Sequence, residues 1–155
     1  MYVAVYGAIL STILAILEVY RFRAEQRERE PRIRVEIARG FMRQGDAVGP
    51  DLIFLDAANA GDKNVTLSFP ALLLPDGKYL MTPIPRGDES NVTFPCELLP
   101  GRSCSTWREA GNLARSLRKN GYSGRIEIVG EYRDAVGNSY KSKPFNFDID
   151  YWSKN

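Results

Sequence analysis

Residues 125–152, RIEIVGEYRDAVGNSYKSKPFNFDIDYW, decide the fold of this chain. Apolar and polar residues alternate on both sides of a short polar segment, and a period of two is typical of β-strands with one buried face. Asp134 and Gly137 belong to the turn between the two halves. We therefore expect an antiparallel β-hairpin whose second strand places alternate residues, from Phe145 to Tyr151, on one face.

The same alternation occurs upstream, from Pro31 onward. The segment RIRVEI (32–37) places three aliphatic residues on one face of a strand and charged residues on the other. Pro-Gly and Pro-Asp-Gly sequences then separate further apolar runs, as expected for turns between strands. The remaining strands are expected in residues 52–61, as a pair within 64–83 that turns at Pro75–Gly77, and as a pair within 91–107 that turns at Pro100–Gly101.

One short helix is expected between the β-segments. Thr106 and Glu109 have the spacing of a capping box, and Gly121 ends the helical pattern that follows them. Apolar residues recur at helical spacing between these signals: Ala110, Leu113, Ala114 and Leu117. This stripe predicts an amphipathic helix with one buried face.

The expected fold class is therefore mainly β. About seven or eight short strands at regular spacing, with one short helix, indicate an antiparallel β-sandwich of immunoglobulin-like type. Residues 31–155 have the length of one such domain. The Cys…Trp…Cys pattern of antibody domains is missing, so this is not an antibody-type domain.

Residues 1–30 differ in kind from the rest of the chain. No charged side chain occurs between Tyr2 and Leu17, and apolar character resumes after Glu18. A helix of about 19 residues spans roughly 28 Å, which is close to the hydrocarbon thickness of a bilayer. We therefore expect a transmembrane helix, followed by a charged helical stalk that Pro31 ends.

The charges around this run predict how the chain would lie in the membrane. No basic residue precedes the run, whereas a secretory signal opens with Lys or Arg. Basic residues follow it instead: Arg21, Arg23, Arg27 and Arg29. Because positive charge stays cytoplasmic, we expect a single-pass inner-membrane protein whose C-terminal domain is cytoplasmic. A cleaved signal and a core or interface helix are the alternatives.

Glu18 is the irregular residue of the apolar run. In a single helix it would reach toward the membrane surface or pair with Arg21, three residues further on. The alternative is a homo-oligomeric bundle in which Glu18 lines a pore. Small residues that permit close helix contacts support this alternative: Gly7, Ser11 and Ala15.

Four short motifs give the chain a recognisable pattern. N-x-G occurs at 59–61, L-P-D-G at 74–77, L-x-P-G at 98–101 and D-x-x-G-x-x-Y-x-S-x-P-F at 134–145. With the N-terminal apolar helix and charged segment, this pattern resembles small bacterial single-pass membrane proteins that carry a C-terminal immunoglobulin-like β-sandwich. Proteins of that kind are mostly uncharacterised, so the resemblance implies an architecture and no activity. The charged segment is shorter here than in that group.

The composition excludes several kinds of catalytic site. The chain contains no histidine, which removes Ser-His-Asp and Cys-His catalysis and the commonest transition-metal ligand. No Gly-rich phosphate loop precedes a helix, and no acidic segment has calcium-loop spacing. We interpret Cys96 and Cys104 as two buried or half-buried thiols, with a disulfide across a hairpin as the alternative. We therefore expect no cofactor, no metal and no enzymatic activity.

The predicted helix offers a candidate surface for a partner. Arg115, Arg118 and Lys119 lie on its polar face, and Trp152 is a candidate aromatic contact near the C-terminus. These residues would meet phosphate or an acidic partner, while a solvated helix face is the simpler interpretation. The net charge of +2 is too small to indicate nucleic-acid binding by itself.

These features predict a non-catalytic, membrane-anchored module for binding or assembly, in which the cytoplasmic β-sandwich recruits or senses a protein partner. One alternative is an oligomeric membrane effector whose N-terminal helices form a bundle or pore gated by the sandwich. The other is an exported envelope domain in which Cys96 and Cys104 would be oxidised.

Overall fold

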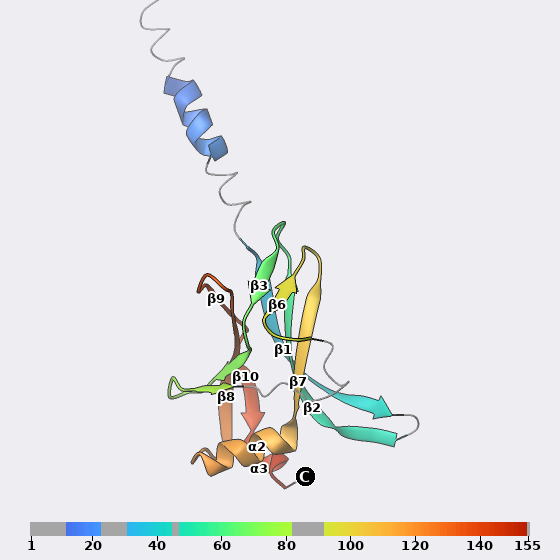
Figure 1. The fold of residues 1–155 in the computed structure, drawn as a ribbon. Helices are drawn as coiled ribbons and strands as arrows, with labels where there is room; N and C mark the ends of the chain where they lie inside the picture. Colours follow the sequence, from blue (N-terminus) through green and yellow to red (C-terminus); the bar gives the residue numbers. More distant parts are fainter. Residues whose placement is uncertain (1–11, 23–30, 45–46, 82–91, 155) are drawn as a thin grey trace, which may run out of the picture.

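The computed structural model describes residues 12–22, 31–44, 47–81 and 92–154, and in these ranges the chain is mainly β, as predicted (Figure 1). Its strands are β1 Ile33–Gln44, β2 Ala47–Asn59, β3 Val65–Leu67, β4 Ala71–Leu73, β5 Tyr79–Met81, β6 Cys96–Leu98, β7 Ser103–Glu109, β8 Arg125–Arg133, β9 Ser139–Lys141 and β10 Phe145–Asp148. Its helices are residues 12–22, α2 Ala110–Lys119 and α3 Ile149–Trp152.

The described strands form three antiparallel sheets. The first has the order β1-β2-β7, and the second has the order β10-β8-β4-β5 with β9 also paired to β8. The third consists of β3 and β6. Because β9 and β10 pair with successive parts of β8, they form one edge of the second sheet. The long strand β1 is an edge of the first sheet.

The predicted hairpin in residues 125–152 is confirmed at its turn and corrected at its end. Ser139 pairs with Arg133 across the turn, and the returning chain continues along β8 through β10. The strand stops at Asp148, where the sequence pattern predicted extension to Tyr151. The carboxylate of Asp148 accepts a hydrogen bond from the N–H of Tyr151 over 3.0 Å, which caps the short helix α3.

The predicted helix forms, although its predicted start is wrong. The four residues of the expected apolar stripe are the buried residues of α2. Gly121 follows the helix with a φ of 87°, as a glycine after a helix C-terminus often does. Thr106, however, lies within β7, and Glu109 occupies the N-cap without a side-chain capping bond. The capping-box spacing is therefore coincidental.

The two larger sheets contact each other around Gly130 in the middle of β8. A Cβ atom at this position would collide with Cδ1 of Leu55 in β2 and would lie 3.2 Å from Cγ1 of Ile37 in β1. A side chain is absent at this contact, so both sheets can close over a common core. The largest fully buried side chains of that core include Tyr132, Phe147, Leu52, Leu67, Leu72, Leu113, Leu117, Ile128 and Ile149.

The predicted fold class is wrong in its topology. The sequence pattern paired the two strands on either side of Pro100–Gly101. A turn does form there, with the N–H of Arg102 bonded to the carbonyl of Leu99 over 3.0 Å. The flanking strands nevertheless join different sheets, because β6 pairs with β3 and β7 pairs with β2. In the part of the chain that the structure describes, three sheets and three helices replace the expected immunoglobulin-like sandwich with an N-terminal helix and one further short helix.

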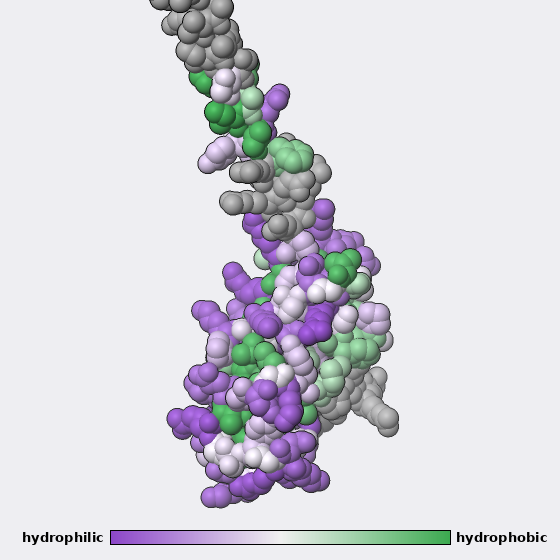
Figure 2. Space-filling model, turned by 90° about the vertical axis from the view of Figure 1, so that its left-hand side faces the viewer, coloured by the Kyte–Doolittle hydropathy of each residue, from purple (hydrophilic) through white to green (hydrophobic). Residues whose placement is uncertain are grey.

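The prediction for the N-terminus is also wrong. The structure describes a helix over residues 12–22, and the residues on either side of it lie outside the described ranges. Its aliphatic side chains are exposed (Figure 2). Among the described residues, no helix has both the length and the apolar character needed to cross a membrane. This finding overturns the predicted transmembrane helix and the single-pass, inner-membrane location with a cytoplasmic domain.

Candidate binding groove

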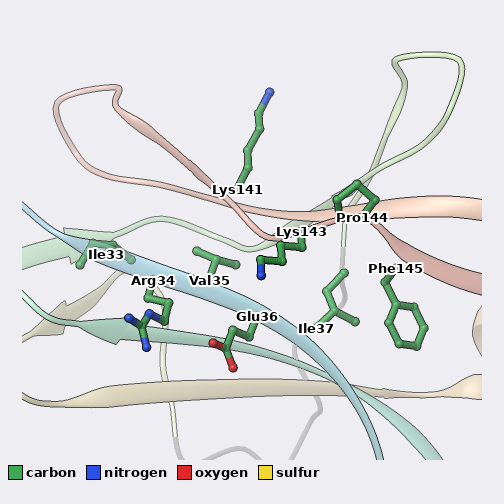
Figure 3. A pocket seen from close by; sticks show the side chains of 9 residues that line it. All are labelled: Ile33, Arg34, Val35, Glu36, Ile37, Lys141, Lys143, Pro144 and Phe145. Carbon is green, nitrogen blue, oxygen red and sulfur yellow. The ribbon is translucent and has the colours of Figure 1, made fainter.

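A groove runs between the edge of β1 and the segment that joins β9 to β10 (Figure 3). Its volume is about 780 Å³. One wall is residues 33–37 of β1, and the other consists of Lys141, Lys143, Pro144 and Phe145. The walls belong to different sheets, so the groove follows the open side of the contact between the two larger sheets.

The backbone of β1 presents hydrogen-bonding groups to this side. The N–H of Ala60 donates to the carbonyl of Arg32 over 2.8 Å. This bond shows that the backbone groups of Arg32 point toward β2. In an antiparallel ladder this bonding alternates from one residue to the next. The N–H and C=O groups of Ile33, Val35 and Ile37 therefore point away from β2. No described strand pairs with this side of β1.

The side chains of β1 divide between the two faces of the sheet, as the RIRVEI pattern predicts. Val35 is buried in the core, and Ile33 and Ile37 are partly buried against it. Arg34 and Glu36 are exposed on the opposite face. The free backbone groups thus belong to the residues whose apolar side chains are anchored, which holds this edge in place.

The opposite wall lacks a comparable row of donors. Ser142 bonds to both backbone groups of Gly130: its N–H donates to the carbonyl over 2.9 Å, and its Oγ accepts from the N–H over 2.9 Å. The pairing register along β8 shifts between β9 and β10 at this point. Pro144, which follows, has no N–H. Irregular backbone and proline are features that protect a strand edge from pairing.

The groove has a positive balance of charge. Lys141 lies 3.7 Å from Oε2 of Glu131, a buried carboxylate that also accepts a hydrogen bond from Arg133 over 2.7 Å. Burial opposes ionisation of Glu131, but hydrogen bonds from Arg133, Ser139 and Tyr79 outweigh it and lower its pKa. Arg34 and Lys143 form no ion pair with any described residue. They remain as exposed cations at the groove.

A second hollow, of about 460 Å³, lies on the outer face of the second sheet near Tyr79 and Met81. Its carboxylates accept hydrogen bonds that stabilise the local structure. Asp134 accepts hydrogen bonds from the N–H of Asn138 over 2.8 Å and from the hydroxyl of Tyr140 over 2.9 Å. Burial opposes the charge of Asp134, yet these bonds lower its pKa. No group of three metal-ligating residues occurs in the described part of the chain.

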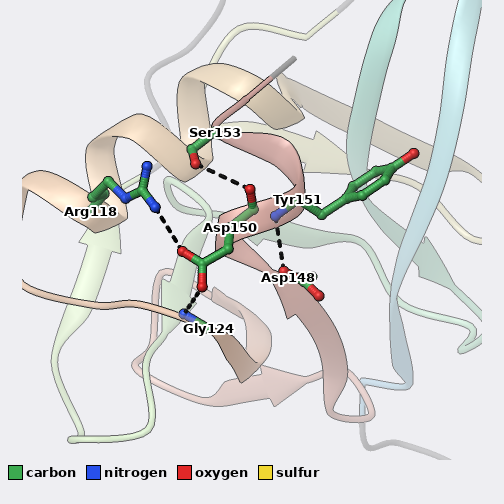
Figure 4. Close-up of polar contacts among 6 residues, drawn as sticks. All are labelled: Arg118, Gly124, Asp148, Asp150, Tyr151 and Ser153. Atoms are coloured by element: carbon green, nitrogen blue, oxygen red, sulfur yellow. Dashed lines mark hydrogen bonds and ion pairs between the residues drawn. The ribbon is translucent and has the colours of Figure 1, made fainter.

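The residues predicted as a partner surface are not brought together into one site. Arg118 forms an ion pair of 2.8 Å with Asp150 of α3 (Figure 4), and Arg115 donates to Asn112 within α2. Lys119 is exposed at the end of α2. Trp152 is only 7% exposed and packs within the core, so its predicted place on the surface is wrong.

Trp152 instead contributes to a link between the C-terminus and the first sheet. The guanidinium of Arg39 in β1 lies 4.5 Å from the centroid of the Trp152 ring. Nε of the same arginine donates to Asp51 of β2 over 3.2 Å. Arg39 therefore connects α3 to the β1–β2 pair through a cation–π contact.

The residues predicted to set membrane topology or to line a pore lie mostly outside the described residues. This applies to Gly7, Ser11, Arg23, Arg27 and Arg29. The others are on the helix over residues 12–22, where Ala15, Glu18 and Arg21 are exposed.

The interpretation of the cysteines as free thiols is confirmed. Cys96 in β6 is half-buried and Cys104 in β7 is buried, and both are free. Burial, reinforced by the neighbouring Cys96, raises the pKa of the Cys104 thiol to about 12. A protonated thiol in this position is a poor nucleophile.

The groove itself was missed by the sequence interpretation. Residues 32–37 carried part of the signal, since their alternation predicts a strand with one charged face. Alternation does not show whether a strand is central or at an edge. That distinction depends on β2 and on the β9–β10 segment, which lies about a hundred residues further along the chain.

The chain matches no protein-family description, and no curated protein matches it in sequence. Among solved structures it is similar to one described as "X-ray structure of Northeast Structural Genomics Consortium target SoR45". That similarity has a TM-score of 0.36 and 13% sequence identity, and it covers 75% of this chain and 85% of that chain.

Proposed function

We propose that this protein is a non-catalytic binding module that holds an extended segment of a partner protein as an added strand along β1. The observation that supports the proposal is the row of N–H and C=O groups at Ile33, Val35 and Ile37, which pair with no described strand and lie beside an open groove. Extended peptides bind exposed sheet edges through such main-chain hydrogen bonds. Pockets beside the edge then select the side chains.

The dimensions of the edge suit a short extended segment. Ile33 and Ile37 are separated by about 14 Å in a strand with a rise of about 3.4 Å per residue. A partner segment of about five residues would span this distance. The groove of about 780 Å³ beside the edge provides space for the side chains that point toward the second sheet.

The chemistry of the described residues favours binding over catalysis. The buried carboxylates Glu131 and Asp134 are both engaged by hydrogen-bond donors from nearby strands and turns. The buried thiol of Cys104 has a raised pKa. The chain contains no histidine to act as a base near neutral pH. The arrangement supports recognition by shape and main-chain hydrogen bonds.

The proposal is tested with the full chain, labelled with ¹⁵N, and acetylated, amidated octapeptides made of four Val-Xaa repeats, where Xaa is Ser, Glu or Lys. A bound strand should slow hydrogen exchange at the amides of Ile33, Val35 and Ile37. The amides of Arg34 and Glu36 bond to β2 already and should change little. If none of the three peptides protects the three edge amides, the proposal is wrong.

Backbone methylation of the peptides separates an added strand from a contact by side chains alone. In antiparallel addition, the Val residues that face the groove also direct their N–H groups to β1, so N-methylation of Val should abolish binding. In parallel addition, N-methylation of Xaa should abolish it instead. Equal binding of both methylated peptides would contradict strand addition. The proposal would also be contradicted if the protein without peptide self-associated and thereby protected the edge amides.

A further inference from the structure

We infer that the segment accepted by β1 is acidic, with carboxylates alternating with apolar residues. This inference rests on the proposed function and concerns the chemistry of the partner. It depends on two features of the groove: which side chains line its inner side and which charges at its rim have no counter-ion among the described residues.

The inner side of the groove selects apolar residues. On the face that points toward the second sheet, an added strand would lie beside the partly buried side chains of Ile33 and Ile37. Phe145, also partly buried, lines the other wall. An apolar side chain between these three would remove apolar surface from water on both walls. Every second residue of the partner is therefore apolar.

The rim of the groove selects negative charge. Lys143 directs its ammonium group across the groove toward β1, whereas Lys141 points away from it (Figure 3). Lys141 is paired with Glu131, but Arg34 and Lys143 have no carboxylate partner among the described residues. A carboxylate that points away from the second sheet would meet Arg34, because side chains directly opposite one another on paired strands share a face, while Lys143 adds positive charge on the inner side of the groove. A lysine or arginine there would be repelled.

Glu36 is the exposed carboxylate among the lining residues of β1, and it limits where acids are accepted. Directly opposite charges of the same sign destabilise a strand pair. An acidic residue of the partner should therefore lie opposite Arg34, with a neutral residue opposite Glu36. Removing the charge of Glu36 should consequently strengthen the binding of an evenly acidic peptide.

The experiment compares the three octapeptides by fluorescence anisotropy against the full chain. The Glu peptide should bind at least about threefold more tightly than the Ser peptide, and the Lys peptide should bind most weakly, as expected for exposed ion pairs. The preference should shrink when salt is raised from 0.05 to 0.5 M, because exposed charges are then screened. Equal affinities for the Glu, Ser and Lys peptides would overturn the inference while leaving the proposed function intact. Loss of binding by all three would overturn both.

Two variants and a matched control assign the preference to named residues. Combined Arg34→Glu and Lys143→Glu should reverse the order, so that the Lys peptide binds better than the Glu peptide. Glu36→Gln should tighten binding of the Glu peptide about twofold or more. Combined Lys63→Glu and Lys119→Glu, at two exposed positions that do not line the groove, changes the net charge as much as the double variant and should leave the order unaltered. Reversal by this control, or none by the groove double variant, would assign the preference to net charge and contradict the inference.

Discussion

The hydroxyl of Tyr132 in β8 donates a hydrogen bond of 2.9 Å to the carbonyl oxygen of Leu55 in β2, and so joins the two larger sheets inside the core. Tyr132 is fully buried, and Thr106 Oγ1 of β7 lies 3.3 Å from the same hydroxyl. Burial raises the pKa of Tyr132, because the charged form would be desolvated. The hydroxyl is therefore a neutral donor throughout the physiological pH range.

Replacing Tyr132 by Phe removes this link and should lower the free energy of unfolding by about 1 kcal/mol. The ring and its packing are retained, so the loss measures the hydroxyl. Urea denaturation monitored by circular dichroism provides the measurement. Tyr151→Phe is the control, because Tyr151 is 54% exposed and the change should stay within about 0.5 kcal/mol. Equal stability of Tyr132→Phe and the natural protein would show that the cross-sheet bond contributes nothing.

Gly130→Ala should destabilise the protein by about 1–3 kcal/mol, because the new methyl group collides with Leu55. The matched control is Gly111→Ala in α2, where a Cβ atom meets its nearest neighbours at 3.5 Å and alanine favours the helix. Gly111→Ala should leave stability unchanged or raise it.

Combining Gly130→Ala with Leu55→Ala tests whether the collision is the cause. The double variant should lose less stability than the sum of the two single changes, because shortening Leu55 removes the atom with which the new methyl group at position 130 collides. Strict additivity would place the effect of Gly130→Ala elsewhere than at Leu55.

Acid should destabilise the folded chain through Glu131 and Asp134. The folded protein lowers the pKa of both groups below their ordinary values of 4.5 and 3.8, so the unfolded chain binds protons first as the pH falls. Their contribution to stability is complete above pH 4.5 and is lost as the pH falls through the lowered values. Urea titrations between pH 7 and pH 2.5 provide the measurement.

Asp134→Asn and Glu131→Gln should each lower stability at pH 7 and flatten its decline in acid. The amide removes the carboxylate that titrates, while it keeps a similar shape. A decline of unchanged steepness in both variants would assign the acid sensitivity to other carboxylates.

The two thiols should react at different rates with a water-soluble maleimide. Cys104 is 4% exposed and its pKa is raised to about 12, so it should be modified only when the protein unfolds. Cys96 is half-buried and should react first. Mass spectrometry at successive reaction times measures both rates, and Cys96→Ser serves as the control. Rapid modification of Cys104 in folded Cys96→Ser would contradict the burial of that thiol.

Sequence patterns predicted the structure correctly where the predicted feature lies within a single helix or strand. The apolar stripe of α2 and its termination at Gly121 depend on helical spacing and on one positive φ angle, and both are confirmed. The N-terminal run shows the limit of composition. Its apolar residues satisfy a count of transmembrane length, but among the described residues no helix is long and apolar enough to cross a membrane.

The sequence by itself determined that residues 32–37 belong to a strand and which of them face inward, because these features depend on alternation along a few neighbouring residues. Only the tertiary structure decided that the strands around Pro100–Gly101 join different sheets, that Trp152 is buried beneath Arg39, and that β1 lies at an open edge. Strand pairing and edge position depend on contacts between residues far apart in the chain. Alternation is the same for a central and an edge strand, so the candidate groove became visible only when β1 and the β9–β10 segment were brought together.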